Sequence, residues 1–243
     1  MEDRQTSIVG QAFFDGVIGW AAWPRAHVAR LLPGDLELAP PNLGPPDRHP
    51  LLVAMGRQRD TAVVYGGVQF DVAVGYDECM LSVPFVRRMG GKQLHTFVAL
   101  MVSGDRRATW SGNTHYGFGK RMGRIERFGD VWTATQDEGG LTMYAAMNPV
   151  DDWVRGPESA SPSIRSIPRL FDAPVIGRRA DGTYVASYFE WNLDHAVVRR
   201  VGLRLFFTSG VGLEPREVQI PPESGIELRG MRWRLGWPES PMF

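Results

Sequence analysis

Short runs of aliphatic, aromatic and β-branched residues, separated by glycine-containing turns, recur through most of this chain. Residues 62–65 and 68–74 flank Gly66-Gly67, and the second run alternates apolar and polar side chains at the period of two that a half-buried strand requires. Strands joined by such tight turns pair as antiparallel neighbours. Further runs predict strands at residues 51–55, 79–86, 94–102, 131–136, 141–147, 184–193, 203–208 and 216–220.

Helical signals are scarce by comparison. The clearest covers residues 24–32, where Pro24 suits a first helical position and Pro33-Gly34 ends the pattern. The chain has 243 residues, 43% of them hydrophobic, and all-β barrels of this length fold as one unit. The sequence therefore predicts one mainly β domain over residues 1–243, an antiparallel barrel that is closed or half closed and has few short helices.

The charge and the hydropathy pattern exclude several classes of function. Basic and acidic side chains balance at a net charge of zero, which leaves no basic face for nucleic acid. No apolar stretch approaches the roughly 20 residues that span a bilayer, and the N-terminus has no secretory signal pattern. We therefore expect a cytoplasmic protein that binds neither nucleic acid nor membrane.

Metal and cofactor sites are not indicated either. The single cysteine, Cys79, excludes cysteine-based metal clusters, and the five histidines include no pair at helical ligand spacing. The segment around Lys120 has Thr114 at the first glycine position and Arg121 at the hydroxyl position of a phosphate-binding loop, and it lacks the third glycine of a dinucleotide fingerprint. We expect no metal and no cofactor.

Lysine usage is the feature that points to chemistry. Of the 27 basic side chains only two are lysines, Lys92 and Lys120. A lysine can lose its proton and become a nucleophilic amine, whereas an arginine cannot. Lys120 lies in the segment Gly117-Phe118-Gly119-Lys120-Arg121-Met122-Gly123, where a neighbouring cation and apolar surroundings favour the neutral amine. It is either a reactive group or a solvated charge in a glycine-rich turn.

A second candidate is acidic. Glu78 opens the apolar run that ends at Val83-Pro84. A carboxylate there is either a surface charge at the end of a strand or a group partly buried at the mouth of a barrel. In the second case, and close to an amine, it can relay protons.

These residues resemble the motifs of the acetoacetate decarboxylase family, of which the chain looks like a divergent member. Family members carry Tyr-x-Glu before an apolar strand that ends in proline, and Tyr76-Asp77-Glu78 with Val83-Pro84 resembles this. They also carry an aromatic-Pro-Lys-Lys segment, and Phe118-Gly119-Lys120-Arg121 is similar to it, with Lys120 lying 42 residues after Glu78. Residues 30–37 resemble the family's helix and following turn. The resemblance extends over most of the chain.

The resemblance implies a cone-shaped β-barrel that assembles as a homo-oligomer and holds the lysine inside. Lys120 takes the position of the lysine that forms a Schiff base, Arg121 that of the adjacent cation, and Glu78 that of the active-site carboxylate. An imine on Lys120 would act as an electron sink when the substrate loses CO2 or a proton from the adjacent carbon. The implied partner is a small-molecule carbonyl compound.

The chain also departs from the family. Gly119 stands where the family has proline, and Gly112-Asn113-Thr114 stands where its decarboxylases have Gly-Arg-Glu. Residues 13–14 and 53–55 lack the arginine and glutamate that line the decarboxylase site. A less polar pocket suits a larger, more apolar carbonyl compound than acetoacetate. Its expected lining is Phe14, Trp20, Met55, Tyr76, Phe118 and Met122.

Three functions remain open. The one we favour is a Schiff-base-forming lyase that acts through Lys120 on a keto acid or related carbonyl substrate, by decarboxylation or by aldol condensation and dehydration, in a specialised biosynthetic pathway. The second is an imine-free cyclase or isomerase of a polyketide-like substrate, in which Lys120 only donates hydrogen bonds. The third is a non-catalytic barrel that binds a small molecule.

Overall fold

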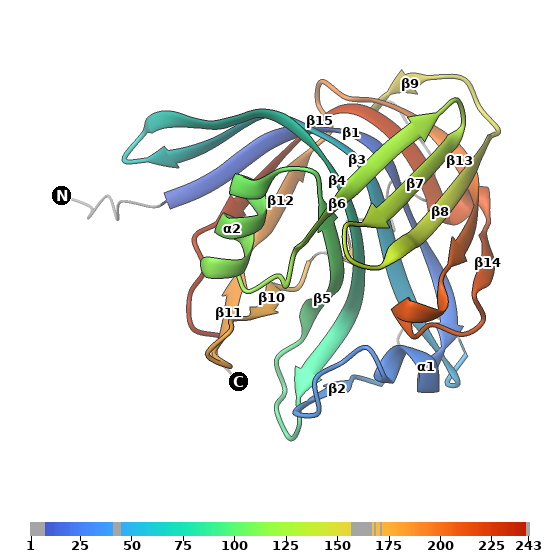
Figure 1. The fold of residues 1–243 in the computed structure, drawn as a ribbon, viewed down its shortest axis with the longest axis horizontal. Helices are drawn as coiled ribbons and strands as arrows, with labels where there is room; N and C mark the ends of the chain where they lie inside the picture. Colours follow the sequence, from blue (N-terminus) through green and yellow to red (C-terminus); the bar gives the residue numbers. More distant parts are fainter. Residues whose placement is uncertain (1–7, 41–44, 157–166, 168, 171, 242–243) are drawn as a thin grey trace.

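Long strands, most of them antiparallel, make up the greater part of the chain in the computed structural model, which describes residues 8–40, 45–156, 167, 169–170 and 172–241 (Figure 1). The elements in chain order are β1 (Ile8–Pro24), α1 (Arg25–Ala29), β2 (Leu36–Leu38), β3 (Arg48–Tyr65), β4 (Val68–Arg88), β5 (His95–Ser103), α2 (Arg106–Thr114), β6 (Arg121–Phe128), β7 (Val131–Gln136), β8 (Gly140–Pro149), β9 (Val154–Arg155), β10 (Val175–Arg178), β11 (Tyr184–Ser187), β12 (Phe189–Asn192), β13 (Val197–Phe207), the 3₁₀ turn η2 (Ser209–Val211), β14 (Glu217–Ile220), the 3₁₀ turn η3 (Pro222–Ser224) and β15 (Gly225–Gly236).

Nine of these strands close into a ring. They are hydrogen-bonded in the order β5, β6, β7, β8, β13, β15, β1, β3 and β4, and β4 pairs again with β5. The pairing of β5 with β6 is parallel, as is that of β5 with β10 outside the ring, and the other pairings are antiparallel. The prediction of a mainly antiparallel barrel is confirmed. Hairpin signals missed the parallel pairs because parallel neighbours need a crossover connection.

The helices were predicted only in part. Helix α1 lies within the expected range of residues 24–32 but spans only Arg25–Ala29. Helix α2 was not expected, and its available signal was Asp105, whose carboxylate accepts a hydrogen bond from the Ala108 backbone N–H at 2.8 Å as an N-cap. No helix in the described residues is long and apolar enough to cross a membrane.

Strands β1 and β15 were also missed. Both are long, and they pair with each other through ten residue positions. Strand β1 contains three glycines, three alanines and an aspartate, and β15 contains three glycines, all residue types of low strand propensity, so their β structure depends on pairing with neighbouring strands more than on local preference.

Two cores lie on opposite faces of the sheet formed by β1, β3, β4, β5 and β15. On one face, Met55, Cys79 and Leu81 belong to the core that the ring encloses. On the other face, Phe14 and Ala54 belong to a second core, to which β10 and β12 contribute. Because side chains alternate along a strand, neighbours such as Ala54 and Met55 serve different cores. Strands β11, β10, β5, β4, β3, β1, β15 and β12 thus form a second, partial enclosure that shares its wall with the ring.

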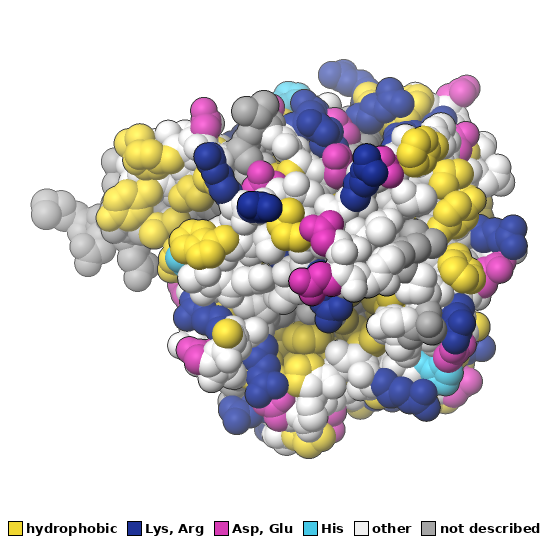
Figure 2. Space-filling model, in the orientation of Figure 1, with side chains coloured by type: hydrophobic (Ala, Val, Ile, Leu, Met, Phe, Trp, Pro, Cys, Tyr) yellow, Lys and Arg dark blue, Asp and Glu magenta, His cyan; other side chains and the backbone are white. Residues whose placement is uncertain are grey.

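An arm extends from this shared wall. The ends of β1, β3 and β4 project beyond the barrel (Figure 1), and the turn Gly66-Gly67 at the tip has φ values of 57° and 84°, as a type I′ turn requires. Hydrophobic side chains gather over the arm (Figure 2), and those of Tyr65, Val68 and Phe70 are half exposed. The expected homo-oligomer stays a prediction.

A close approach of two strands supports one wall of the second core. Gly16 of β1 and Gly56 of β3 are directly paired, and the Phe14 ring packs over both of them. A Cβ atom added at Gly16 would lie 2.2 Å from the Met55 carbonyl oxygen and 2.8 Å from Cζ of Phe14. The position of the Phe14 ring therefore depends on the absence of a side chain at Gly16.

We expect Gly16→Ala to lower the free energy of unfolding by about 1–3 kcal/mol, because backbone and ring must move apart to admit a methyl group. Urea unfolding followed by tryptophan fluorescence measures the change. Gly34→Ala is the matched control, since no atom lies within 4 Å of a Cβ added there. Equal stability of the two variants would show that the close approach is not required.

Candidate functional site

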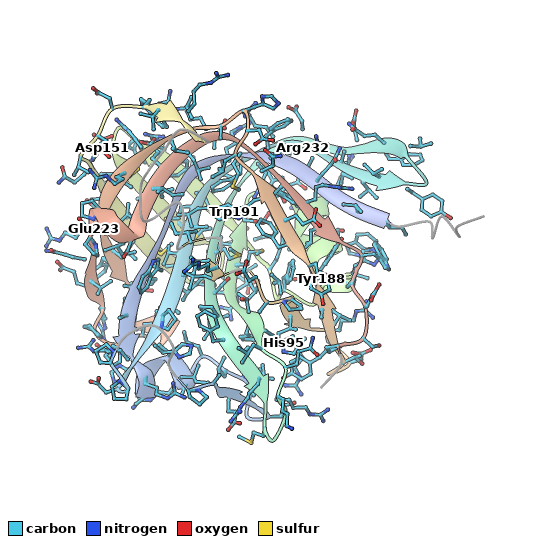
Figure 3. All side chains as sticks on the ribbon, turned by 180° about the vertical axis from the view of Figure 1, so that it is seen from behind. His95, Asp151, Tyr188, Trp191, Glu223 and Arg232 are labelled. Atoms are coloured by element: carbon cyan, nitrogen blue, oxygen red, sulfur yellow. The ribbon has the colours of Figure 1, made fainter. Side chains whose placement is uncertain are left out.

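A cavity lies between the shared wall and the strands β10 and β12. Its empty space, including the open volume at its mouth, is about 820 Å³. In the rear view (Figure 3), Tyr188 and Trp191 mark the position of β12, which contributes Phe189 to the lining. Most of the lining is apolar, and the exceptions are Gln58, Tyr76, Glu78, Ser82, Lys120 and Trp233. An apolar cavity with a few polar groups is the usual form of a small-molecule site.

The polar part of this cavity contains a buried ion pair. Nζ of Lys120 lies 2.6 Å from Oε2 of Glu78 and donates a hydrogen bond to it, and the two side chains are only 7% and 11% exposed. Such a pair adds little to stability, because desolvation of both charges offsets their attraction. Buried charges in a cavity are therefore candidates for chemistry.

Three further residues surround the pair. The Gln58 side-chain amide donates to the other oxygen of Glu78 at 3.4 Å, and its own carbonyl oxygen accepts from Nε1 of Trp233 at 2.7 Å. The Tyr76 ring centroid lies 5.5 Å from Nζ of Lys120, within the range of a cation–π contact. Burial, followed by the Glu78 and Asp105 charges, raises the pKa of the Tyr76 phenol well above its usual value, so its hydroxyl remains protonated.

The last turn of α2 positions Lys120. The Asn113 side chain accepts from the Lys120 backbone N–H at 2.5 Å and donates to its carbonyl oxygen at 2.9 Å. Beneath the lysine side chain lies Gly112, where an added Cβ atom would be 2.6 Å from Cε of Lys120. Asn113 therefore fixes the backbone of Lys120, and the absence of a side chain at Gly112 leaves the space that the Lys120 side chain occupies.

The chain approaches Lys120 through a backbone that proline cannot adopt. Gly119 has φ +59° and Gly117 has φ +64°, both in the left-handed region that favours glycine. Proline is restricted to φ near −65°. The local backbone conformation therefore requires glycine at position 119, where the acetoacetate decarboxylase family has proline.

The structure brings together most of the expected site residues. Lys120, Glu78, Tyr76, Phe118 and Phe14 all line the cavity. The lysine is not inside the nine-stranded ring, however. It lies in the second enclosure, on the opposite face of the shared wall from the ring's core. Whether these residues carry out catalysis stays a prediction.

Four other expected residues lie elsewhere. Arg121 is exposed and donates to Oε1 of Gln136 at 3.0 Å, because it begins β6 and faces away from the cavity. The sulfur of Met122 accepts a hydrogen bond from the Thr109 hydroxyl at 3.2 Å. Met55 belongs to the ring's core, and Trp20 packs against the second core without lining the cavity. The expected cation beside the amine is thus absent from the cavity lining, as far as it is described.

Sequence reasoning also missed several contributors. Gln58 faces the cavity only because β3 pairs with β4 in the register that places it opposite Tyr76, and no local pattern reveals that register. Met231, Trp233 and Leu235 line the cavity at a spacing of two residues, which was a visible signal of strand β15. Within the described residues, no group of three or more His, Cys, Asp or Glu side chains is arranged to hold a metal ion.

Comparison with known proteins gives matches of shape rather than of sequence. No protein-family model and no curated protein sequence matches the chain. Among solved structures, acetoacetate decarboxylase from Legionella pneumophila subsp. pneumophila str. Philadelphia 1 has a TM-score of 0.60 and 15% identity, covering 96% of this chain and 87% of that one. The chain has the acetoacetate decarboxylase-like fold.

Two further structures share this acetoacetate decarboxylase-like fold. The enduracididine biosynthesis enzyme MppR, complexed with the condensation product of pyruvate and imidazole 4-carboxaldehyde, has a TM-score of 0.61 and 11% identity, covering 96% of this chain and 88% of that one. An acetoacetate decarboxylase-like enzyme from Sphingomonas wittichii RW1 has a TM-score of 0.61 and 12% identity, covering 98% and 94%. At such identities the likeness concerns the fold, and chemistry must be argued from the residues.

The role of Gly112 in this acetoacetate decarboxylase-like barrel can be tested by labelling. We expect Gly112→Ala to fold but to displace the flexible end of Lys120, which breaks the pair with Glu78 and exposes the amine. Limiting acetylation, read by peptide mass spectrometry, should then modify Lys120 several-fold faster relative to the exposed Lys92.

Thr114→Ala is the matched control for this labelling, since Thr114 is exposed on the same helix. An unchanged ratio of Lys120 to Lys92 labelling in Gly112→Ala would contradict the positioning role.

Proposed function

We propose that this protein is a Schiff-base-forming lyase that acts on a carbonyl compound through Lys120. The observation that carries the proposal is the buried pair of Lys120 and Glu78 in a cavity that is otherwise mostly apolar. The acetoacetate decarboxylase-like fold supports it, since one neighbour of similar shape is named a decarboxylase and another is solved with a condensation product.

Imine formation follows from the geometry of the pair. Glu78 accepts a proton from the Lys120 ammonium across 2.6 Å, which leaves a neutral amine and a carboxylic acid. The amine adds to the carbonyl carbon of the substrate to form a carbinolamine. Glu78 then returns the proton to the carbinolamine hydroxyl, which departs as water and leaves an iminium ion beside the Glu78 carboxylate.

The iminium ion makes the neighbouring carbon reactive. It withdraws electrons from the adjacent C–H bond, so Glu78 can remove that proton and produce an enamine. The enamine carbon can then attack an aldehyde, forming a carbon–carbon bond and an alkoxide that takes the proton held by Glu78. Removal of a second proton by Glu78 and departure of the hydroxyl as water give a conjugated iminium ion, and water then hydrolyses it to release the product and the Lys120 amine. Tyr76, which stays protonated, is available as a hydrogen-bond donor to developing oxygen charge.

The lining favours a neutral substrate over a keto acid. A keto acid would bring its carboxylate into a cavity that already contains Glu78. Within the described residues, Lys120 is the sole cation of the lining, with neither arginine nor histidine beside it. A second buried carboxylate without a further partner is unfavourable, so we propose aldol condensation and dehydration rather than decarboxylation.

The same pair also fits the imine-free reaction, because Lys120 already donates a hydrogen bond to Glu78 inside the cavity and could donate one to a substrate atom there. The two functions differ in their need for a primary amine. An arginine at position 120 can donate hydrogen bonds but cannot form an imine.

Borohydride trapping is the direct test. With a neutral aldehyde or ketone we expect a reduced adduct on Lys120, stronger than with a keto acid of similar size, read by intact-mass and peptide mass spectrometry. Lys120→Arg should lose the adduct, whereas Lys92→Arg, which removes the other lysine, should keep it. If Lys120→Arg retains turnover of a substrate found by screening, the imine-free function replaces the lyase.

The proton relay makes a separate prediction. Glu78→Gln should slow trapping about 100-fold or more, in the range that loss of a general acid–base group produces. Asp77→Asn is the matched control, because that partly exposed carboxylate immediately precedes Glu78 in β4 and pairs with Arg57 at 3.4 Å. Equal trapping rates for Glu78→Gln and the unmodified protein would remove Glu78 from the mechanism.

A further inference from the structure

A second chamber adjoins the cavity of Lys120. It lies between the arm strands β1, β3 and β4 and helix α2, and its empty space, including its open mouth, is about 640 Å³. The two hollows share the side chains of Tyr76, Phe118, Lys120, Trp233 and Leu235. Lys120 therefore stands at the junction of two spaces.

Five of the residues that line the second chamber are aromatic. Tyr116 and Trp237 belong to it alone and join the shared aromatic side chains. Tyr116 stacks on Phe118 with ring centroids 5.4 Å apart, and Trp237 meets Tyr116 edge-on at 6.2 Å. These rings contact one another, so a ligand does not insert between them, and the faces and edges that they turn toward the chamber favour a planar ring or conjugated group packed against them.

One polar atom in this chamber has no partner. Oγ1 of Thr61 is buried and makes no hydrogen bond within the described part of the chain, and Thr61 lines the second chamber. The register of β3 against β4 shifts between Thr61 and Ala62, an irregularity of the kind that re-aims a side chain. Buried hydroxyl groups are normally hydrogen-bonded, and a rotation of the Thr61 side chain about its Cα–Cβ bond would turn this hydroxyl into the chamber, where a ligand atom could be its partner.

The chamber also selects by charge. Apart from Lys120, its described lining contains no ionisable group other than the tyrosines Tyr76 and Tyr116, and burial raises the pKa of both. An ionic group would be desolvated there without compensation. A neutral group is therefore the one that fits.

We propose that the second chamber binds a planar, uncharged aromatic or conjugated group of the substrate, with the Thr61 hydroxyl as its hydrogen-bond partner, while the carbonyl of the same molecule reacts at Lys120. This inference rests on the proposed lyase function. The substrate is then an extended carbonyl compound whose two ends occupy different chambers. Specificity for the end away from the carbonyl is set by Thr61, Tyr116 and Trp237.

Three aldehydes that differ in one feature at a time test the proposal by borohydride trapping on the full chain. Propanal fills the Lys120 cavity only, 3-phenylpropanal adds a ring, and 3-(4-hydroxyphenyl)propanal adds a ring with a hydrogen-bonding oxygen. We expect the concentration for half-maximal trapping to fall in that order.

Two variants address the chamber itself. Thr61→Val keeps the shape of the side chain and should cancel the advantage of the hydroxyphenyl over the phenyl aldehyde, about two- to tenfold for one hydrogen bond. Ser111→Leu, on the α2 side of the chamber, should weaken trapping of both ring aldehydes and leave propanal unchanged. Thr114→Val, at an exposed position of α2, is the control and should behave as the unmodified protein.

The outcomes separate this inference from the proposed function. If propanal labels Lys120 but neither Thr61→Val nor Ser111→Leu alters trapping of the ring aldehydes, the chamber is overturned and the lyase stands. If no aldehyde labels Lys120, the lyase falls. The chamber is then tested by calorimetry with 3-(4-hydroxyphenyl)propan-1-ol, which has no carbonyl. Binding that Thr61→Val weakens supports the proposed ligand site in the chamber, and absence of binding overturns it.

Discussion

The alternation of side chains along the shared strands is the constraint on which the site depends. In β4, Cys79 and Leu81 enter the core of the ring, while Glu78 and Met80 face the cavity. A shift of one residue in register would exchange these two sets. The tight turn at Gly66-Gly67 and the contact of Gly16 with Gly56 hold the strands in the register that keeps Glu78 on the cavity side.

The connection between β5 and β6 explains why the lysine is where it is. These strands are parallel neighbours, so the chain must cross from one end of β5 to the start of β6, and α2 makes that crossover. The end of α2 supplies Asn113 and Gly112, and Lys120 follows just before β6 begins. The same crossover that completes the ring therefore delivers the amine to the wall that carries Glu78.

The sequence allowed prediction of what local patterns encode. The alternation of apolar and polar residues and the glycine-containing turns predicted most strands and the barrel. The scarcity of lysine indicated Lys120 as the candidate reactive residue. Only the family resemblance assigned Lys120 and Glu78 to the same site, because 42 residues of chain separate them, and the direct contact between them is a finding of the structure. Arg121 was misplaced because its position depends on where β6 starts, and Gln58 was missed because its position depends on pairing between strands. Interactions between distant segments thus limited the prediction of the site.

The division of the shared wall between two cores bears on how such a protein changes over time. Side chains that line the cavity contribute little to the packing of the ring, because the ring's own core lies on the far face of the sheet. Substitutions on the two faces should therefore act nearly independently. A barrel built in this way can exchange one ligand for another by successive single substitutions while it remains folded, which makes its binding specificity readily evolvable.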